Sequence, residues 1–295
     1  MKLKGIYQSY SLPKQFFLLF LLIFVCFFVA NLIGLSGSML FGASSLTDLQ
    51  NEKTVYALKF LQAWSAVGVF VLPPFLFAYL SGNSLSFNAV SRHQLMLTAV
   101  IMLFAMPLIN AMSVWNEQLQ LPIFLESVEL WMREAEAKAM KITEAFLTVN
   151  TGLGLAVNIL IIAIIPALGE ELLFRGVIQK ELSKWSGKIH LSIWITAFLF
   201  SAMHMQFLGF FPRFIIGGLL GYMFFWSGSI WLPILAHFVN NATAVILSFM
   251  VTNGRLTKDV ETIGVNEGQT SMVLISLASV GLLLYLLKEI SLKKA

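Results

Sequence analysis

The chain has 295 residues, of which 58% are hydrophobic and only 12% are charged, about half of the ~25% usual in soluble domains. So few polar side chains cannot cover the surface of a water-soluble fold of this size, which excludes a soluble globular protein. The same composition excludes a disordered or collagen-like chain. A single cysteine, Cys26, leaves no intramolecular disulfide.

Apolar stretches close to the ~20 residues that a bilayer-spanning helix needs recur along the chain. The first is longer than the h-region of a signal peptide, so we expect a permanent helix there. The sixth is short and contains Gly217, Gly218 and Gly221, which indicates close helix packing or a partial span. We predict an all-α, polytopic membrane protein of about eight transmembrane helices, at about residues 16–35, 60–80, 95–115, 152–178, 191–211, 213–227, 230–250 and 271–287.

The distribution of Lys and Arg predicts the orientation of these spans. The segments on the side of the termini hold ten cations and only two acids, Glu181 and Glu289, whereas the opposite segments hold eight cations and eleven acids. By the positive-inside rule, both termini are expected to be cytoplasmic in a multi-pass protein of the cell membrane. The segments of the first kind are residues 1–15, 81–94, 179–190 and 288–295.

The long segment between the third and fourth spans carries an amphipathic pattern. Its apolar residues recur at steps of three and four, while Glu129 with Arg133 and Glu134 with Lys138 make i, i+4 ion pairs on the other face. We expect an amphipathic outer helix at about residues 122–146, which lies on the outer membrane surface or caps the bundle.

We predict one membrane domain with three parts. Residues 1–149 hold the N-terminal transmembrane helices and the outer helix, and residues 150–250 form a helical core. Residues 251–295 hold an outer loop, the last transmembrane helix and a basic cytoplasmic tail.

Ionisable side chains inside the spans are candidates for a functional site, because a bilayer makes them costly. Glu171 and Arg175 are four residues apart on one helix face, in the favourable order for an ion pair. Glu170 points about 100° away from them and is free to face other helices. An interfacial salt bridge would explain Glu171 and Arg175, but not the second acid beside them.

Two histidines on separate spans extend this polar group. One histidine in an apolar helix is more often a packing residue, but two of them with a buried acid favour chemistry. Glu170 and His204 could hold a water molecule and remove its proton. His237 and Asn241, four residues apart, could donate hydrogen bonds to the oxyanion of a tetrahedral intermediate, with Asn240 as a weaker candidate. This set suffices for amide hydrolysis.

Metal binding is the competing chemistry, since Glu170, His204 and His237 are ligand types that zinc accepts. The His-Glu-x-x-His pattern of familiar zinc peptidases is absent, and no span presents two histidines at helical spacing. We therefore prefer a site that requires no cofactor, and a divalent metal such as zinc stays open as an alternative.

The polar residues also resemble a known family, the CPBP intramembrane proteases. This family includes the type II CAAX prenyl endopeptidases and bacterial Abi proteins linked to bacteriocin processing and self-immunity. The resemblance covers about residues 150–250. It rests on three motifs that occur in order on separate spans: Glu170-Glu171-x-x-x-Arg175, Phe200-x-x-x-His204 and His237-x-x-x-Asn241.

The resemblance implies a helical membrane protein of about eight spans, with a cavity between the helices where peptide bonds are cut. It also implies that Glu170 and His204 activate the water, and that His237 and Asn241 form the oxyanion hole. The neighbouring polar and aromatic residues would support these four. They are Glu171, Arg175, Phe200 and Asn240.

The sequence thus predicts an intramembrane endopeptidase that acts on membrane-anchored peptides, either prenylated CAAX-type or bacteriocin leader-type substrates. A non-proteolytic membrane partner or immunity protein is an alternative. A transporter is a weaker one, because transporters tend to show repeated halves that this chain lacks. The bilayer is an expected partner and nucleic acid is not, because the cations lie in topogenic loops and form no patch with interleaved aromatic residues.

Overall fold

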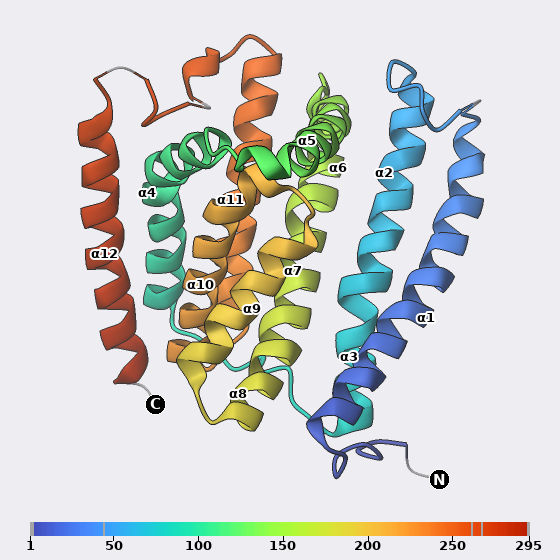
Figure 1. Cartoon of the computed structure of the whole chain (residues 1–295), viewed down its shortest axis with the longest axis vertical. Helices are drawn as coiled ribbons and strands as arrows, with labels where there is room; N and C mark the ends of the chain where they lie inside the picture. Colours follow the sequence, from blue (N-terminus) through green and yellow to red (C-terminus); the bar gives the residue numbers. More distant parts are fainter. Residues whose placement is uncertain (1–2, 44, 261, 267, 294–295) are drawn as a thin grey trace.

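The computed structural model describes residues 3–43, 45–260, 262–266 and 268–293. Every regular element within these residues is helical (Figure 1). The α-helices are α1 (Leu12–Ser38), α2 (Glu52–Ala66), α3 (Leu72–Ser81), α4 (Arg92–Glu117), α5 (Glu126–Leu147), α6 (Gly152–Asn158), α7 (Ile165–Glu171), α8 (Lys180–Ser186), α9 (Ile189–Met203), α10 (Phe210–Ser227), α11 (Trp231–Thr252) and α12 (Thr270–Leu292). Three π-helical stretches, η2 (Val67–Val71), η4 (Ile159–Ile164) and η5 (Leu172–Gln179), and four 3₁₀ turns, η1 (Met39–Phe41), η3 (Ile123–Leu125), η6 (Phe207–Gly209) and η7 (Lys258–Val260), complete the described elements.

Helical runs of spanning length confirm the predicted polytopic membrane protein. In the described part of the chain, seven runs are long and apolar enough to cross a bilayer, and α9 is an eighth apolar helix of only 15 residues. The seven are Leu12–Phe41, Glu52–Ser81, Arg92–Glu117, Gly152–Ser186, Phe207–Ser227, Trp231–Thr252 and Thr270–Leu292.

The fifth and sixth spans differ from the prediction in their lengths. The fifth was expected at 191–211, but α9 ends at Met203, because Met205 adopts a left-handed backbone with φ of 53° that stops a helix. The sixth, expected to be the short one, is part of a 21-residue helical run. The short span is therefore α9, and its early end leaves a connection before α10 that approaches the polar residues of the core.

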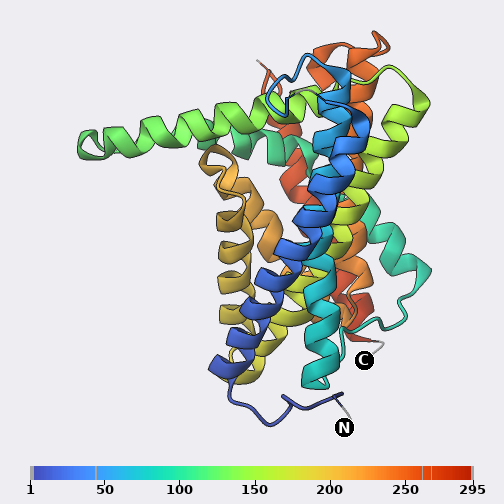
Figure 2. The same ribbon diagram turned by 90° about the vertical axis from the view of Figure 1, so that its right-hand side faces the viewer.

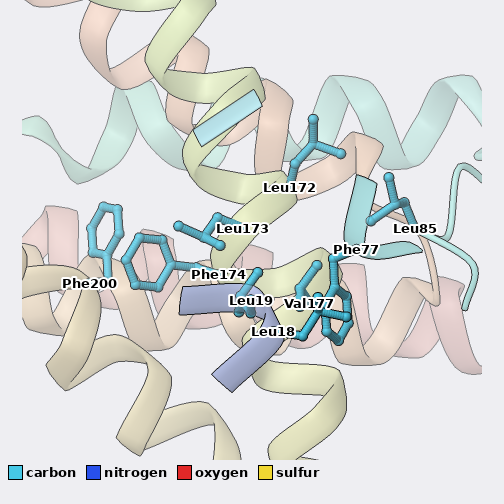
Figure 3. Packing of buried hydrophobic residues seen from close by; sticks show 9 residues of the cluster. All are labelled: Leu18, Leu19, Phe77, Leu85, Leu172, Leu173, Phe174, Val177 and Phe200. Atoms are coloured by element: carbon cyan, nitrogen blue, oxygen red, sulfur yellow. The ribbon is translucent and has the colours of Figure 1, made fainter. Parts of the chain in front are cut away.

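The helices pack around two buried clusters. In the first, α1 and α3 pack on η5 and α9, and Figure 3 shows Phe200 of α9 beside Phe174 of η5. The second joins α4, α10, α11 and α12. Because lipid tails are as apolar as leucine, this close packing and the polar contacts described below, rather than the hydrophobic effect, hold the helices together. The first cluster fixes the helices that carry the candidate site.

Small residues let α9 and α10 approach closely, as the glycines of the sixth span predicted. A Cβ atom on Gly217 would lie 3.2 Å from Cα of Ala197, and one on Gly218 would lie 2.6 Å from the ring of Trp194. Backbone atoms of α10 thus reach the interior of the bundle, where side chains of η5 meet them.

Helix α5 lies across the end of the bundle opposite to the chain termini and extends beyond the bundle on one side (Figure 2). This confirms the predicted amphipathic helix, with η3 as its first turn. The expected ion pair between Glu129 and Arg133 is present at 2.8 Å. The expected pair between Glu134 and Lys138 is not among the ion pairs of the described residues.

Candidate active site

Two adjacent carboxylates end α7 inside the bundle. Glu171 is fully buried and accepts a hydrogen bond from Nη1 of Arg175 at 2.8 Å, as the i, i+4 spacing predicted. Arg175 is also fully buried, and its Nη2 donates to the backbone oxygen of Gly217 at 2.9 Å. Glu170 is 8% exposed and makes no ion pair with Arg175 among the described residues. The predicted division between a paired acid and a free acid is therefore present in the structure.

Glu171 has a second partner that the sequence did not predict. Its Oε1 lies 2.9 Å from Nδ1 of His237 on α11. A carboxylate oxygen only accepts hydrogen bonds when ionised, so Nδ1 of His237 carries a hydrogen and donates it. This contact turns Nε2 of His237 toward Glu170, 4.0 Å from its Oε2. Glu171 therefore orients the imidazole as well as neutralising Arg175.

His204 immediately follows α9 and approaches Glu170 from the other side. Its Nδ1 lies 2.8 Å from the backbone oxygen of Phe200, and because a carbonyl oxygen only accepts, Nδ1 is the donor. In the neutral ring, Nε2 then carries the lone pair. Nε2 lies 3.9 Å from Oε2 of Glu170.

Upright helices would not bring these two residues together. At ~1.5 Å per residue, Glu170 is about 15 Å along its helix from Lys180, and His204 is about 24 Å from Lys188. Figure 1 shows that α9 runs obliquely across the bundle, which reduces the depth that its length covers. The tilt of the short α9 thus places both side chains at one level.

Two imidazole nitrogens lie near one carboxylate oxygen at the end of α7. Nε2 of His204 and Nε2 of His237 lie 3.9 and 4.0 Å from the same oxygen, Oε2 of Glu170. This oxygen is buried and has no hydrogen-bond partner among the described residues. The distances are too long for direct hydrogen bonds. A water molecule can bridge Oε2 to an imidazole nitrogen at either distance.

The ring of Phe200 supports this group. Its centroid lies 4.8 Å from Cζ of Arg175, a cation–π contact, and 5.2 and 5.9 Å from the ring centroids of His204 and His237. Phe174 packs edge-on against it at 5.3 Å. Phe200 is 4% exposed, so a rigid aromatic wall separates the imidazoles from the apolar core.

Asn241 lies one helical turn beyond His237 but bonds elsewhere. Its Nδ2 donates to the backbone oxygen of Ile162 at 3.0 Å, and its Oδ1 accepts from Nδ2 of Asn240 at 3.1 Å. Pro166 has no N–H to offer to Ile162, four residues before it. Asn241 therefore provides a hydrogen bond that the proline withholds, and no hydrogen bond between described residues links either asparagine to Glu170 or the histidines.

Comparison with known proteins shows which family the residues of this site match. Residues 152–243 match the family described as "Type II CAAX prenyl endopeptidase Rce1-like". These residues form an Rce1-like domain of the CPBP family. They include all three motifs, which confirms the predicted resemblance.

The similarity to a curated relative also covers only part of the chain. A Bacillus subtilis (strain 168) protein with the name "Uncharacterized protein YpbD" is 34% identical over 89 residues, which are 29% of this chain and 42% of that protein. The similarity thus spans less than half of this relative's length. No solved structure matches the chain.

Next to His204 lies a group of polar contacts that the sequence analysis missed. Nη1 of Arg213 donates to Oε1 of Gln206 at 2.7 Å, and Nη2 donates to the backbone oxygen of Gln206. From α4, Nδ2 of Asn116 donates to the backbone oxygen of Phe207 at 3.0 Å. The only sequence signal was the cation Arg213 at the start of an apolar run, and its position there resembled a loop charge. These contacts fix the connection that follows His204.

The donor set of the Rce1-like domain does not fit a closed zinc site. Two ligands of one tetrahedral zinc ion at ~2.0 Å lie roughly 3.3 Å apart, closer than the 3.9 and 4.0 Å between Oε2 of Glu170 and the imidazoles of His204 and His237. No group of three or more His, Cys, Asp or Glu side chains suited to a metal ion occurs among the residues with a described position. We therefore derive no step through a metal.

Proposed function

We propose that this chain is an intramembrane endopeptidase that hydrolyses peptide bonds of membrane-associated substrates. The observation that carries the proposal is that Nε2 of His204 and Nε2 of His237 both lie at water-bridging distance from Oε2 of Glu170, in a domain of the type II CAAX prenyl endopeptidase family. A base beside a held water molecule is the arrangement that peptide hydrolysis without a covalent intermediate requires.

In the proposed mechanism, Glu170 is the general base and His204 orients the water. Nε2 of His204 accepts one hydrogen of the water, and Glu170 removes the other proton as the water oxygen bonds to the carbonyl carbon of the substrate. The carbonyl oxygen becomes an oxyanion. When this intermediate collapses, the C–N bond breaks and Glu170 returns the proton to the leaving nitrogen. Each proton in this sequence comes from the water or from this chain, and we propose that no cofactor is required.

The oxyanion would be stabilised by His237 and Asn241. Nε2 of His237 donates when the ring is protonated, and the carboxylate of Glu171 at its other nitrogen favours that form. Asn241 has a second hydrogen on Nδ2, since its bond to Ile162 uses only one. Glu171, Arg175, Phe200 and Asn240 would hold these groups in place, as the contacts of the first three support.

The proposed substrates are peptides anchored to the membrane, of the prenylated CAAX type or the leader type. The family description supports the first of these. We also propose that both termini are cytoplasmic, as the excess of Lys and Arg on their side supports. In this orientation α5 lies at the outer end of the bundle.

Cleavage of a prenylated, membrane-anchored peptide by the purified protein in liposomes tests the proposal. We expect Glu170→Gln and His204→Ala to lower the rate by about 10²–10⁴-fold, the usual contribution of acid–base groups. His190→Ala is the matched control, because this exposed histidine lies on α9, the helix that precedes His204, and bonds to Tyr222 instead. Equal rates for the wild type and both site variants would refute the assigned roles.

The main alternative is a membrane partner that binds another protein without cleaving it. The projection of α5 beyond the bundle (Figure 2), with Trp131 half exposed, favours this as the second candidate. It predicts that Trp131→Ala abolishes the cellular phenotype while Glu170→Gln leaves it intact. The endopeptidase predicts the reverse.

A further inference from the structure

A polar cavity lies at the end of the bundle opposite to the termini. It has a volume of about 930 Å³ and shares no lining residue with the candidate active site. The first turns of α2 form one wall, and the end of α5 with the connection to α6 forms the other (Figure 1). Its polar lining residues are Gln50, Glu52, Tyr56, Lys59, Lys141, Glu144, Thr148, Asn150 and Thr151.

Lys59 lines this cavity with a buried charge. The residue is 2% exposed, and no hydrogen bond or ion pair joins it to another described residue. Its Nζ lies 5.6 Å from the ring centroid of Phe146 and 6.0 Å from that of Tyr56, so two aromatic rings are near the ammonium group. An ammonium group that is largely removed from water and has no anion beside it is costly. The cavity therefore suits a ligand that brings a negative charge to Lys59, and Lys141 adds a second cation at its exposed rim.

The depth of Lys59 matches the level of lipid phosphates. The run Glu52–Ser81 has 30 residues and is ~45 Å long, close to the ~40–45 Å of a bilayer with its headgroups. Lys59 lies seven residues from Glu52, or ~10 Å from the outer end of this run. Side chains on a helix tilt toward its N-terminus, which here is the surface, so the ammonium group lies near the base of the headgroup layer.

We propose that this cavity binds the phosphate of a membrane phospholipid, with Lys59 and Lys141 as its charged donors. The two acids of the lining, Glu52 and Glu144, are exposed and line the same cavity as these lysines. They fit a headgroup that carries an ammonium group next to its phosphate, as phosphatidylethanolamine does. The proposal is independent of peptide cleavage, because it concerns other residues and a non-reacting ligand.

Thermal unfolding of the full chain in detergent micelles, titrated with lipid, tests the proposal. A ligand that binds only the folded state raises its melting temperature. We expect dioleoyl phosphatidylethanolamine to raise it, whereas dioleoylglycerol, which lacks the phosphate, has no effect. We expect Lys59→Gln to need about tenfold more phospholipid for the same rise, since one charge-assisted hydrogen bond is lost.

Three further arms complete the experiment. Lys53→Gln is the matched control, because Lys53 is exposed on the same helix and does not line the cavity, and it should titrate like the wild type. Lys141→Gln changes only an exposed rim residue, so it should weaken binding even if Lys59→Gln fails to fold. Equal shifts from dioleoylglycerol, or wild-type titrations for both cavity variants, would overturn the proposal. A full shift from inorganic phosphate alone would overturn the assignment to a lipid.

Discussion

Oε1 of Glu171 lies 2.9 Å from Nδ1 of His237, and this one contact joins two helices whose motifs are 66 residues apart. The same oxygen accepts from Arg175 at 2.8 Å, and Glu171 and Arg175 are both fully buried. A buried ion pair that also holds an imidazole fixes the direction of the ring. The second acid of the Glu170-Glu171 motif is therefore a positioning residue for His237, besides being the counter-ion of Arg175.

Replacement of the Glu171 carboxylate by the isosteric amide separates its role as counter-ion of Arg175 from its role in positioning His237. We expect Glu171→Gln to lower the free energy of unfolding by about 3–5 kcal/mol, because it leaves Arg175 as a buried charge without a counter-ion. We also expect peptide cleavage by the remaining folded protein to fall, since the imidazolium form of His237 loses its neighbouring negative charge.

Denaturant unfolding and cleavage rates per folded molecule measure the two parts. Glu289→Gln, near the end of α12, is the control for the loss of one carboxylate and should behave like the wild type. Wild-type cleavage by folded Glu171→Gln would show that His237 does not depend on Glu171.

The hydrogen bond between Asn241 and Ile162 offers a test that needs no substrate. Asn241→Ala leaves the carbonyl oxygen of Ile162 without this donor, and we expect a loss of about 1 kcal/mol in unfolding free energy. In a Pro166→Ala background, residue 166 regains an N–H that can donate to the same oxygen. The loss from Asn241→Ala should then become smaller.

A double-mutant cycle with these two changes measures their coupling energy. Asn253→Ala is the control and should not couple to Pro166→Ala, because Asn253, just after α11, donates to the backbone oxygen of Val149 instead. Additive effects of Pro166→Ala and Asn241→Ala would mean that the asparagine does not compensate for the proline.

The sequence predicted which polar residues lie together inside the bundle better than it predicted how they bond. Glu170, Glu171 and Arg175 stand out because a bilayer excludes ionisable groups, and the i, i+4 rule correctly paired two of them. The contacts of Glu171 with His237 and of Asn241 with Ile162 depend on how α11 packs against the helix run that contains η4 and α7. Helical periodicity within one span carries no information about that packing.

The end of α9 was missed for a related reason. Hydropathy stays high from α9 into α10, so the apolar pattern predicted a span at 191–211. The helix stops because Met205 takes a left-handed backbone, and Arg213 and Asn116 then hold the following residues. Of these residues, Arg213 and Asn116 are polar. Their partners are backbone atoms or residues of other helices, which composition does not reveal.

The stability of the turn between α4 and α5 is expected to depend on pH. The backbone N–H of Leu121 and then the guanidinium of Arg133 hold the pKa of Glu129 below its usual value. A carboxylate with a lowered pKa stabilises the folded form above its unfolded-state pKa, and this contribution is lost as pH falls through the folded-state value. The turn should therefore loosen below about pH 4.

Amide hydrogen exchange at Leu121 measures this effect as a function of pH, after correction for the intrinsic exchange rate. In Glu129→Gln the neutral amide cannot titrate, so protection should no longer change in this pH range. A wild-type profile that is flat between pH 6 and pH 3 would contradict the prediction.

Gly217 is the position where one methyl group should affect both packing and the site. A Cβ there would lie 3.1 Å from Cβ and 3.2 Å from Cα of Ala197 on α9. The backbone oxygen of Gly217 accepts a hydrogen bond from Arg175 at 2.9 Å. Gly217→Ala must push α9 and α10 apart, so we expect a loss of about 1–3 kcal/mol in unfolding free energy and a lower cleavage rate as Arg175 and Glu171 shift.

Gly281→Ala, in α12, is the matched control because its Cβ meets no atom within 4 Å. There, the better helix propensity of alanine should leave stability unchanged or raise it by up to about 1 kcal/mol. Equal effects of the two substitutions would show that the contact between α9 and α10 is not tight at Gly217.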